Sequence, residues 1–288
     1  MKIFTIGGSG LVGSRITDLL KEKKYEIDDL SLTSGVDITD PSSLDIIKND
    51  TEHEVVLHLA AKADVEGCEL DKPLGEKGAA YRINVNGTQN VAEACLASKK
   101  KLLYISTDFV FDGAKELPYK YTEDDQPNPV NWYAMTKYKG EEVVEKSGVD
   151  YAILRIAYPF RADEFPLKKD FVHAIMGRLA NNQPIAAVTD HIMTPTFIDD
   201  IAFAIDAVIN NNAQGIYHVV GGQSLTPYDA FMLMADQFEY NKSLISKITR
   251  EEFFKGKAPR PFNLSISNAK IEKLGVKMRS FEEGLKTI

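Results

Sequence analysis

The sequence contains few of the residues that mark disulfide-stabilised or membrane-spanning proteins. Of its 288 residues only 2 are cysteines, Cys68 and Cys95, and they form neither a CxxC motif nor a metal-binding spacing. We therefore expect unpaired thiols in a reducing compartment. No apolar run approaches the ~18 residues of a transmembrane helix, and we expect no secretory leader before the first strand-like segment. These shortages predict a cytoplasmic protein that does not bind membranes.

Basic residues are also in deficit. The 34 Lys and Arg residues face 42 Asp and Glu residues, which gives a formal net charge of −8. Such a balance argues against a nucleic-acid partner and against an anionic membrane surface. A phosphorylated ligand can still bind through a helix N-terminus and a few local basic side chains. The chain offers no cluster of metal ligands, so we expect no metal site.

What the sequence does contain is an alternation of strand and helix patterns in its first half. Strand-like segments are Ile3–Ile6, Leu30–Leu32, Val55–Leu59, Leu102–Ser106 and Tyr151–Ile156, and helical patterns are Leu11–Lys23, Ala79–Ser98 and Tyr133–Ser147. Strand–helix repetition of this kind predicts an α/β fold, a Rossmann-type doubly wound parallel sheet with helices on both faces. Ligands of such sheets bind at the carboxyl ends of the strands.

The pattern changes after Arg155. Proline-punctuated loops alternate with helical patterns at Phe171–Ala180, Ile198–Ile209, Pro227–Phe238 and Asn268–Leu274. We expect a dinucleotide-binding domain at residues 1–156, with a return segment at about 184–212, and a smaller C-terminal substrate-binding lobe at about 157–183 and 213–288. The run Lys99–Lys101 is predicted to be a solvated helix end, because basic residues suit a helix C-terminus.

A glycine-rich turn follows the first strand and opens the first helix. In Gly7–Gly13, Gly7 permits a tight turn, Gly10 allows the backbone to approach a pyrophosphate, and Gly13 lets helix and strand pack closely. Ser9, Leu11 and Val12 belong to the same turn and are expected to contact the cofactor. The free amides of the helix N-terminus favour phosphate.

The spacing Gly-x-x-Gly-x-x-Gly resembles that of the extended short-chain dehydrogenase/reductase superfamily, which binds NAD or NADP. A carboxylate at the end of the second strand would select NAD, but Ser31–Ser34 contains only small hydroxyl and apolar side chains. Arg15 lies just past the glycines and is a candidate for the 2′-phosphate. NADP(H) is therefore favoured, with NAD(H) as the alternative.

Further cofactor contacts are expected after the second and third strands. The resemblance suggests that Asp37 binds the adenine amino group and that Ile38 packs on the ring, whereas Asp40 before a proline is interpreted as a helix cap. Ala60 and Ala61 are small enough for a flat nucleotide to cross the strand end. Lys62 follows them directly and is a further candidate.

The candidate reaction centre combines Thr107 at the end of the fourth strand with Tyr133 and Lys137 in a Tyr-x-x-x-Lys pattern. Residues at this helical spacing share one face. Tyr133 is expected to donate a proton to a ketone during reduction, and Thr107 to polarise the same oxygen. Lys137 is expected to lower the pKa of Tyr133 and to bind the nicotinamide ribose.

Three motifs narrow the resemblance to dTDP-4-dehydrorhamnose reductases. Ser106–Gly113 is similar to their Ser-Thr-Asp-Tyr-Val-Phe-Asp-Gly signature, Pro129–Tyr133 matches their approach to the catalytic tyrosine, and Arg260–Asn263 resembles their Arg-Pro-x-Asn motif. The resemblance covers nearly the whole chain and implies reduction of a nucleotide-linked 4-keto-6-deoxy sugar. The chain departs from these reductases at Asp64–Glu69 and at Arg155–Phe160, where they carry a sugar-lining Arg-Thr/Ser-x-Trp-Val-Tyr-Gly run.

Substrate contacts are assigned by position. Asp108 and Val110 flank Thr107 and are expected to touch the sugar, and Arg260 is a candidate for the diphosphate. Two other functions stay open: an epimerase or dehydratase that retains NAD, and a non-catalytic regulatory subunit resembling the β subunit of methionine adenosyltransferase. A single acid beside Thr107 argues against dehydration. A homodimer is a family expectation.

Overall fold

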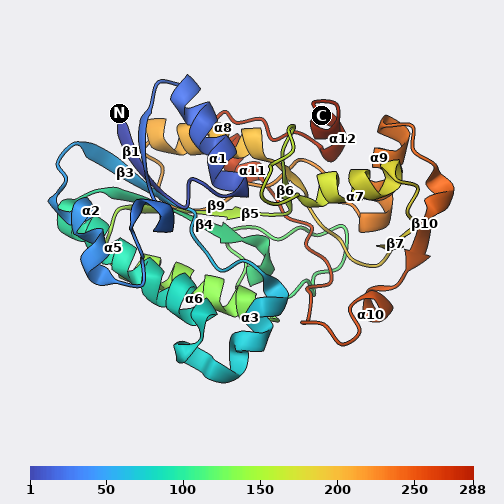
Figure 1. The fold of residues 1–288 in the computed structure, drawn as a ribbon, viewed down its shortest axis with the longest axis horizontal. Helices are drawn as coiled ribbons and strands as arrows, with labels where there is room; N and C mark the ends of the chain where they lie inside the picture. Colours follow the sequence, from blue (N-terminus) through green and yellow to red (C-terminus); the bar gives the residue numbers. More distant parts are fainter.

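Six parallel strands form the central sheet of the protein in a computed structural model that describes residues 1–288 (Figure 1). Their order is β2-β1-β3-β4-β5-β9. The bounds are β1 (Lys2–Ile6), β2 (Glu26–Leu30), β3 (His53–His58), β4 (Lys101–Thr107), β5 (Tyr151–Ile156) and β9 (Gly215–His218). The chain reverses its direction of travel across the sheet between β1 and β3, which is the point where such sheets bind ligands. The predicted doubly wound fold is confirmed.

Helices cover both faces of this sheet (Figure 1). One face carries α1 (Leu11–Glu22) and α8 (Ile198–Asn210), and the other carries α2 (Asp45–Asn49), α5 (Thr88–Ser98) and α6 (Trp132–Lys146). Successive strand residues point to opposite faces, so Ile3 packs in the core beneath α1 while Phe4 packs in the core beneath α5. Strands buried on both faces read as near-continuous apolar runs, as β4 and β5 do.

The remaining elements connect the sheet to a smaller lobe. Before α5 lie α3 (Val65–Asp71) and α4 (Ala79–Tyr81), and after β5 lie β6 (Pro159–Phe160), α7 (Phe171–Ala180), β7 (Ile185–Val188), β8 (Thr196–Phe197), α9 (Pro227–Gln237), β10 (Ile245–Ile248), α10 (Arg250–Phe253), α11 (Ala269–Glu272) and α12 (Phe281–Leu285). Strand β7 pairs with β10, and β6 pairs with β8. Phe160 packs against Phe281 with 5.3 Å between ring centroids and anchors the lobe core.

The domain division remains a prediction, and sheet membership bears on its edges. Strand β9 lies within the part assigned to the lobe, yet it pairs with β5 in the main sheet. Strand β7 lies within the predicted return segment, yet it pairs with β10 of the lobe. The chain therefore crosses between the two parts more often than the sequence pattern indicates.

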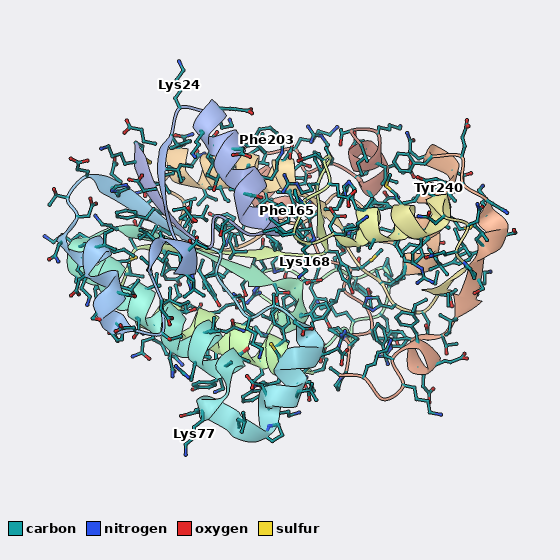
Figure 2. All side chains as sticks on the ribbon, in the orientation of Figure 1. Lys24, Lys77, Phe165, Lys168, Phe203 and Tyr240 are labelled. Atoms are coloured by element: carbon teal, nitrogen blue, oxygen red, sulfur yellow. The ribbon has the colours of Figure 1, made fainter.

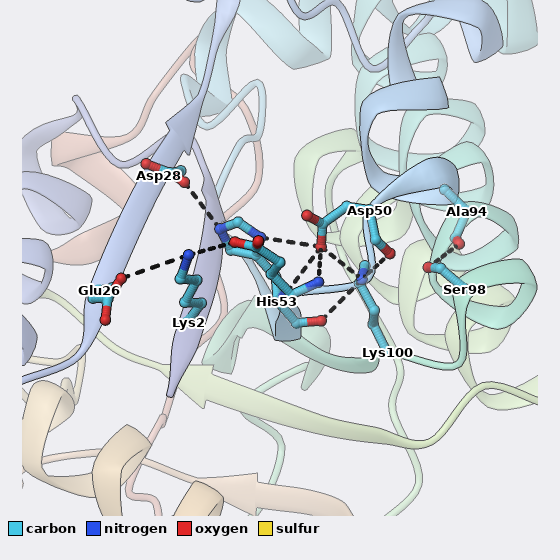
Figure 3. A network of polar contacts seen from close by, with 9 residues as sticks. Lys2, Glu26, Asp28, Asp50, His53, Ala94, Ser98 and Lys100 are labelled. Atoms are coloured by element: carbon cyan, nitrogen blue, oxygen red, sulfur yellow. Dashed lines mark hydrogen bonds and ion pairs between the residues drawn. The ribbon is translucent and has the colours of Figure 1, made fainter.

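Two local predictions are wrong. The second strand is Glu26–Leu30 rather than Leu30–Leu32, because an edge strand tolerates the alternating polar residues that hid it from the pattern. Lys100 is not solvated: it is 3% exposed, and its Nζ donates to the Asp50 carboxylate at 2.9 Å and to the carbonyls of Asp50 and His53 at 2.8 Å and 2.9 Å (Figure 3). All three donors of the ammonium are satisfied, which is the condition for burying it.

Other local predictions are confirmed. β5 and α7 have the predicted bounds. Asp40 caps the short turn that Pro41 begins, where its side chain accepts a hydrogen bond from the Ser42 amide. Cys68 and Cys95 are both buried and unpaired. No helix has the length and apolar character needed to cross a membrane.

Candidate active site

The glycine turn closes the carboxyl end of β1 against the end of β3. Gly7 has φ +86°, and a Cβ there would lie 2.9 Å from the Ala60 amide nitrogen. A Cβ on Gly13 would lie 2.4 Å from the Gly7 carbonyl oxygen. Helix α1 then begins at Leu11 with no side chain capping its first amides. This cradle fits a dinucleotide pyrophosphate, because the backbone is open to close approach and its free amides face the strand ends.

One cavity of about 570 Å³ extends from this turn toward β2. It is lined by predicted cofactor residues Gly7, Ser9, Gly10, Asp37, Ile38, Ala60 and Ala61, together with Ser31, Thr33 and Arg82. The Asp37 carboxylate accepts from the Thr39 amide at 2.9 Å, which fixes its orientation. The cavity has the position and lining expected for an adenosine half-site.

Two basic residues predicted to contact the cofactor are held elsewhere. Arg15 forms a two-pronged ion pair with Asp199, with Nε–Oδ1 and Nη2–Oδ2 distances of 2.7 Å and 2.6 Å. Lys62 directs its Nζ toward Asp71 at 3.6 Å. Neither side chain lines either of the two cavities at the glycine turn. Both assignments remain predictions.

A second cavity of about 480 Å³ opens from the same turn toward β4 and α6. It brings together Thr107, Tyr133 and Lys137, and Leu11, Val12 and Gly13 form its opposite wall. Asn131 caps α6 by accepting from the Ala134 amide at 2.8 Å, so the helix begins just before Tyr133. Lys168, labelled in Figure 2, comes from the segment between β6 and α7 and also lines the cavity.

Burial sets the protonation of the pair on α6. Lys137 is 3% exposed, and its Nζ donates to the Ile105 carbonyl at 2.7 Å and lies 4.0 Å from the centre of the Tyr104 ring. Burial lowers the pKa of Lys137 to about 7. Burial also raises the pKa of Tyr133 well above its usual value, against the opposing effect of its hydrogen bond to Thr107. The expectation that Lys137 lowers the pKa of Tyr133 is therefore wrong for the protein on its own, because desolvation dominates.

The predicted substrate residues differ in their surroundings. Asp108 lines the second cavity, accepts from the Thr107 hydroxyl at 3.1 Å, and has no hydrogen-bond partner for its other oxygen. Burial raises the pKa of Asp108 to about 7. Val110 is fully buried in a hydrophobic cluster and does not line the cavity. Arg260 is paired with Glu66 at 2.7 Å, outside the cavity lining.

Comparison with known proteins places these features in a family. The profile of the RmlD substrate binding domain matches residues 1–288. The chain belongs to this family. It is 30% identical over 301 residues to dTDP-4-dehydrorhamnose reductase of Aggregatibacter actinomycetemcomitans, covering 100% of this chain and 98% of that protein. It is 28% identical over 294 residues to methionine adenosyltransferase 2 subunit beta of Xenopus tropicalis, covering 97% of this chain and 84% of that protein.

A solved structure supports the same grouping. The crystal structure of dTDP-4-dehydrorhamnose reductase from Bacillus anthracis str. Ames, in complex with NADP, superposes with a TM-score of 0.88 at 28% identity, covering 99% of this chain and 97% of that one. The overall arrangement of the RmlD family thus extends across the sheet and the lobe. The predicted extended short-chain dehydrogenase/reductase membership is confirmed.

Two residues that support the site of this RmlD-family chain were missed from the sequence. Asn84 lies in a π-helical turn (Arg82–Gly87), where its Oδ1 accepts from the Lys62 amide at 2.8 Å and its Nδ2 donates to Thr136 at 3.0 Å. It ties the segment after β3 to α6. Asp29 accepts from the Gly8 amide at 2.7 Å and so fixes the glycine turn. An asparagine inside a helical apolar pattern, and an acid near the end of β2, were the available signals.

Tyr158 lies in the segment that departs from the reductase pattern, and it lines the second cavity of this RmlD-family chain, the one that holds Thr107, Tyr133 and Lys137. Its hydroxyl lies 2.9 Å from His191 Nε2. Burial raises the pKa of Tyr158 well above its usual value, so its hydroxyl keeps its proton at neutral pH. The sequence could not reveal this contact, because nothing in the local pattern joins Tyr158 to His191.

Proposed function

We propose that the protein is an NADPH-dependent reductase of a nucleotide-linked 4-keto-6-deoxy sugar. The observation that carries the proposal is that Thr107, Tyr133 and Lys137 line one cavity, which opens onto the glycine turn. Relatives named dTDP-4-dehydrorhamnose reductase support the substrate class, since they match the whole chain. The location in the cytoplasm and a homodimeric state belong to the same proposal.

In this mechanism the side chains act on the substrate carbonyl. A reduced nicotinamide, when bound, would supply the hydride that reduces it. Tyr133 keeps its proton at neutral pH because burial raises its pKa above the usual value, and it donates that proton to the developing alkoxide oxygen. Thr107, which contacts Tyr133 at the end of β4, orients the same oxygen. Lys137 is held beside Tyr133 by the hydrogen bond that its Nζ donates to the Ile105 carbonyl oxygen.

The adenosine cavity supports a preference for the 2′-phosphate of NADPH. Ser31 and Thr33 supply small hydroxyls there, and Asp29, the nearby acid, is engaged by the Gly8 amide. Arg82 is the basic side chain that lines this cavity, whereas Arg15 is paired with Asp199. We therefore assign recognition of the 2′-phosphate to Arg82, with Arg15 as the competing assignment.

Binding measurements separate these two arginines. Arg82→Ala is expected to weaken NADPH binding roughly tenfold while leaving NADH binding within twofold, because a charge-assisted contact to phosphate is lost. Arg15→Ala is the matched control and should leave the ratio of the two dissociation constants unchanged. A fall in NADPH affinity confined to Arg15→Ala would reverse the assignment.

Turnover of NADPH with a dTDP-4-keto-6-deoxyhexose tests the proposed reaction. Tyr133→Phe should lower kcat by about 10²–10⁴-fold, because the phenol is the general acid. Tyr138→Phe on the same helix is the matched control, since that hydroxyl does not line the cavity and its loss should leave kcat unchanged.

The same assay weighs the alternatives. NADPH binding without turnover of any nucleotide keto sugar would overturn the proposed reductase activity. It would favour a role as a subunit, which is the role that the name methionine adenosyltransferase 2 subunit beta gives to those relatives. Epimerisation or dehydration with no net oxidation of NADPH would favour the remaining enzymatic alternative. Light scattering of the purified protein tests the homodimer.

A further inference from the structure

Tyr158 occupies an unusual place in the wall of the catalytic cavity. It follows β5 with φ +39°, a left-handed backbone that residues other than glycine rarely adopt unless their surroundings hold them there. Its ring packs edge-on against Phe109 with 6.1 Å between centroids, and Phe109 packs edge-on against Tyr133 at the same distance. Phe171 contacts the Tyr158 ring from the lobe at 6.0 Å. The ring is therefore fixed relative to the proton donor by one shared phenylalanine.

The hydroxyl of Tyr158 is committed to a partner behind this wall. His191 is 1% exposed; its Nε2 lies 2.9 Å from the Tyr158 hydroxyl and its Nδ1 lies 3.0 Å from the Pro261 carbonyl oxygen. A carbonyl can only accept, so Nδ1 carries the hydrogen and Nε2 accepts from the phenol. The hydrogen bonds run in one direction, from Tyr158 through His191 to Pro261. Tyr158 consequently presents its ring to the cavity, and its hydroxyl is not free to donate a hydrogen bond to a ligand there.

Pro261 belongs to the segment that carries Arg260. The Arg260 guanidinium donates to Glu66 at 2.7 Å and to the Ala258 carbonyl at 2.9 Å. The neighbouring Pro259 carbonyl accepts from Asn131 Nδ2 at 2.9 Å, and Asn131 caps the helix of Tyr133. The segment 258–261 is thus attached on one side to the catalytic helix and on the other, through His191, to the cavity wall.

We propose that Tyr158 and His191 act as a positioning pair for the nucleotide sugar. The pair sets the distance between the catalytic cavity and the segment 258–261, so that Arg260 meets the diphosphate of a sugar whose carbonyl lies at Tyr133. This inference rests on the proposed function and assigns the pair to binding of the sugar nucleotide, not of the dinucleotide cofactor.

A double-mutant cycle on the full chain tests the pair. Tyr158→Phe and His191→Leu should each raise KM for the nucleotide sugar roughly tenfold, which corresponds to about 1.4 kcal/mol, and should leave kcat and KM for NADPH within about twofold. KM for the nucleotide sugar should be no higher in the double variant than in the more impaired single variant, because both changes break one chain of hydrogen bonds. His191→Gln, which restores a donor and an acceptor, should recover most of the loss. Tyr25→Phe removes an equivalent hydroxyl, bonded to Asp206 at 2.7 Å, and should change nothing.

The contrary outcomes are equally distinct. Effects on KM for the nucleotide sugar that multiply in the double variant would overturn the pairing. The pairing would also be overturned if KM for NADPH rose as much as KM for the nucleotide sugar and the melting temperature fell, because Tyr158 and His191 would then form only a structural contact. If the wild type turns over no keto sugar, the proposed reaction fails, and calorimetric titration with dTDP and UDP decides the inference separately. Weaker nucleotide binding in both single variants supports it. Equal binding in all variants, or no binding by the wild type, overturns it.

Discussion

Asp108 should make the stability of the protein depend on pH in an uncommon direction. Its carboxyl is buried, one oxygen has no partner, and its pKa is raised from 3.8 to about 7. The folded protein therefore holds a proton that the unfolded chain releases between these two values. The stabilisation is fully present below pH 3.8 and is lost as the pH rises to about 7.

The size of the effect follows from the same two values. The interval between 3.8 and about 7 corresponds to roughly 4 kcal/mol of unfolding free energy. Asp108→Asn removes this dependence, because an amide does not titrate, while it keeps an oxygen that can accept from Thr107. The free energy of unfolding of Asp108→Asn minus that of the wild type should therefore rise by up to roughly 4 kcal/mol between about pH 4 and pH 8 and then level off.

Urea unfolding at a series of pH values measures this difference by linear extrapolation. Asp40→Asn provides a control of opposite sign: the hydroxyl and amide of Ser42 hold the pKa of Asp40 below its usual range, so its contribution is lost as the pH falls. Parallel stability curves for the wild type and Asp108→Asn would refute the reasoning, since they would show that Asp108 has the same pKa in both states.

Two further predictions concern stability and use the same unfolding assay. Glu141→Gln should lower the free energy of unfolding by about 3–5 kcal/mol, because it leaves Arg155 without the buried carboxylate that it now contacts at 2.6 Å and 2.9 Å. The partly exposed Glu142, which pairs with Lys146, is the control: Glu142→Gln should cost less than about 1 kcal/mol, and equal losses would contradict the role of burial. Gly113→Ala should lower the free energy of unfolding more than Gly256→Ala does, although φ at the two glycines is similar, +77° and +75°. Only at Gly113 would the added Cβ meet backbone atoms, at 2.3 Å. Equal losses would show that backbone strain alone matters.

The sequence was sufficient for features that depend on neighbours along the chain. Strand β5 and helix α7 have the predicted bounds, because apolar runs and helical spacing are local signals. The glycine turn and the Tyr133–Lys137 spacing predicted the candidate site for the same reason, and both line one cavity. Motifs of this kind record short-range geometry.

Features that depend on distant partners were not accessible. Lys100 is buried because Asp50 and His53 surround its ammonium, and Arg15 is turned toward Asp199, 184 residues along the chain. The raised pKa of Tyr133 arises from burial, which the Tyr-x-x-x-Lys pattern does not report. Long-range pairing and desolvation are properties of the folded molecule, so no local pattern predicts them.

Strand β9 has a consequence for how the chain acquires its structure. The sheet cannot be completed until Gly215–His218 joins β5, and all of α7, β7 and β8 must already have been synthesised by then. The edge of β5 consequently stays unpaired through the synthesis of about one fifth of the chain, a template for intermolecular strand pairing. A nascent chain interrupted before residue 215 would expose this edge permanently, so premature termination there should produce aggregation rather than a soluble half-protein.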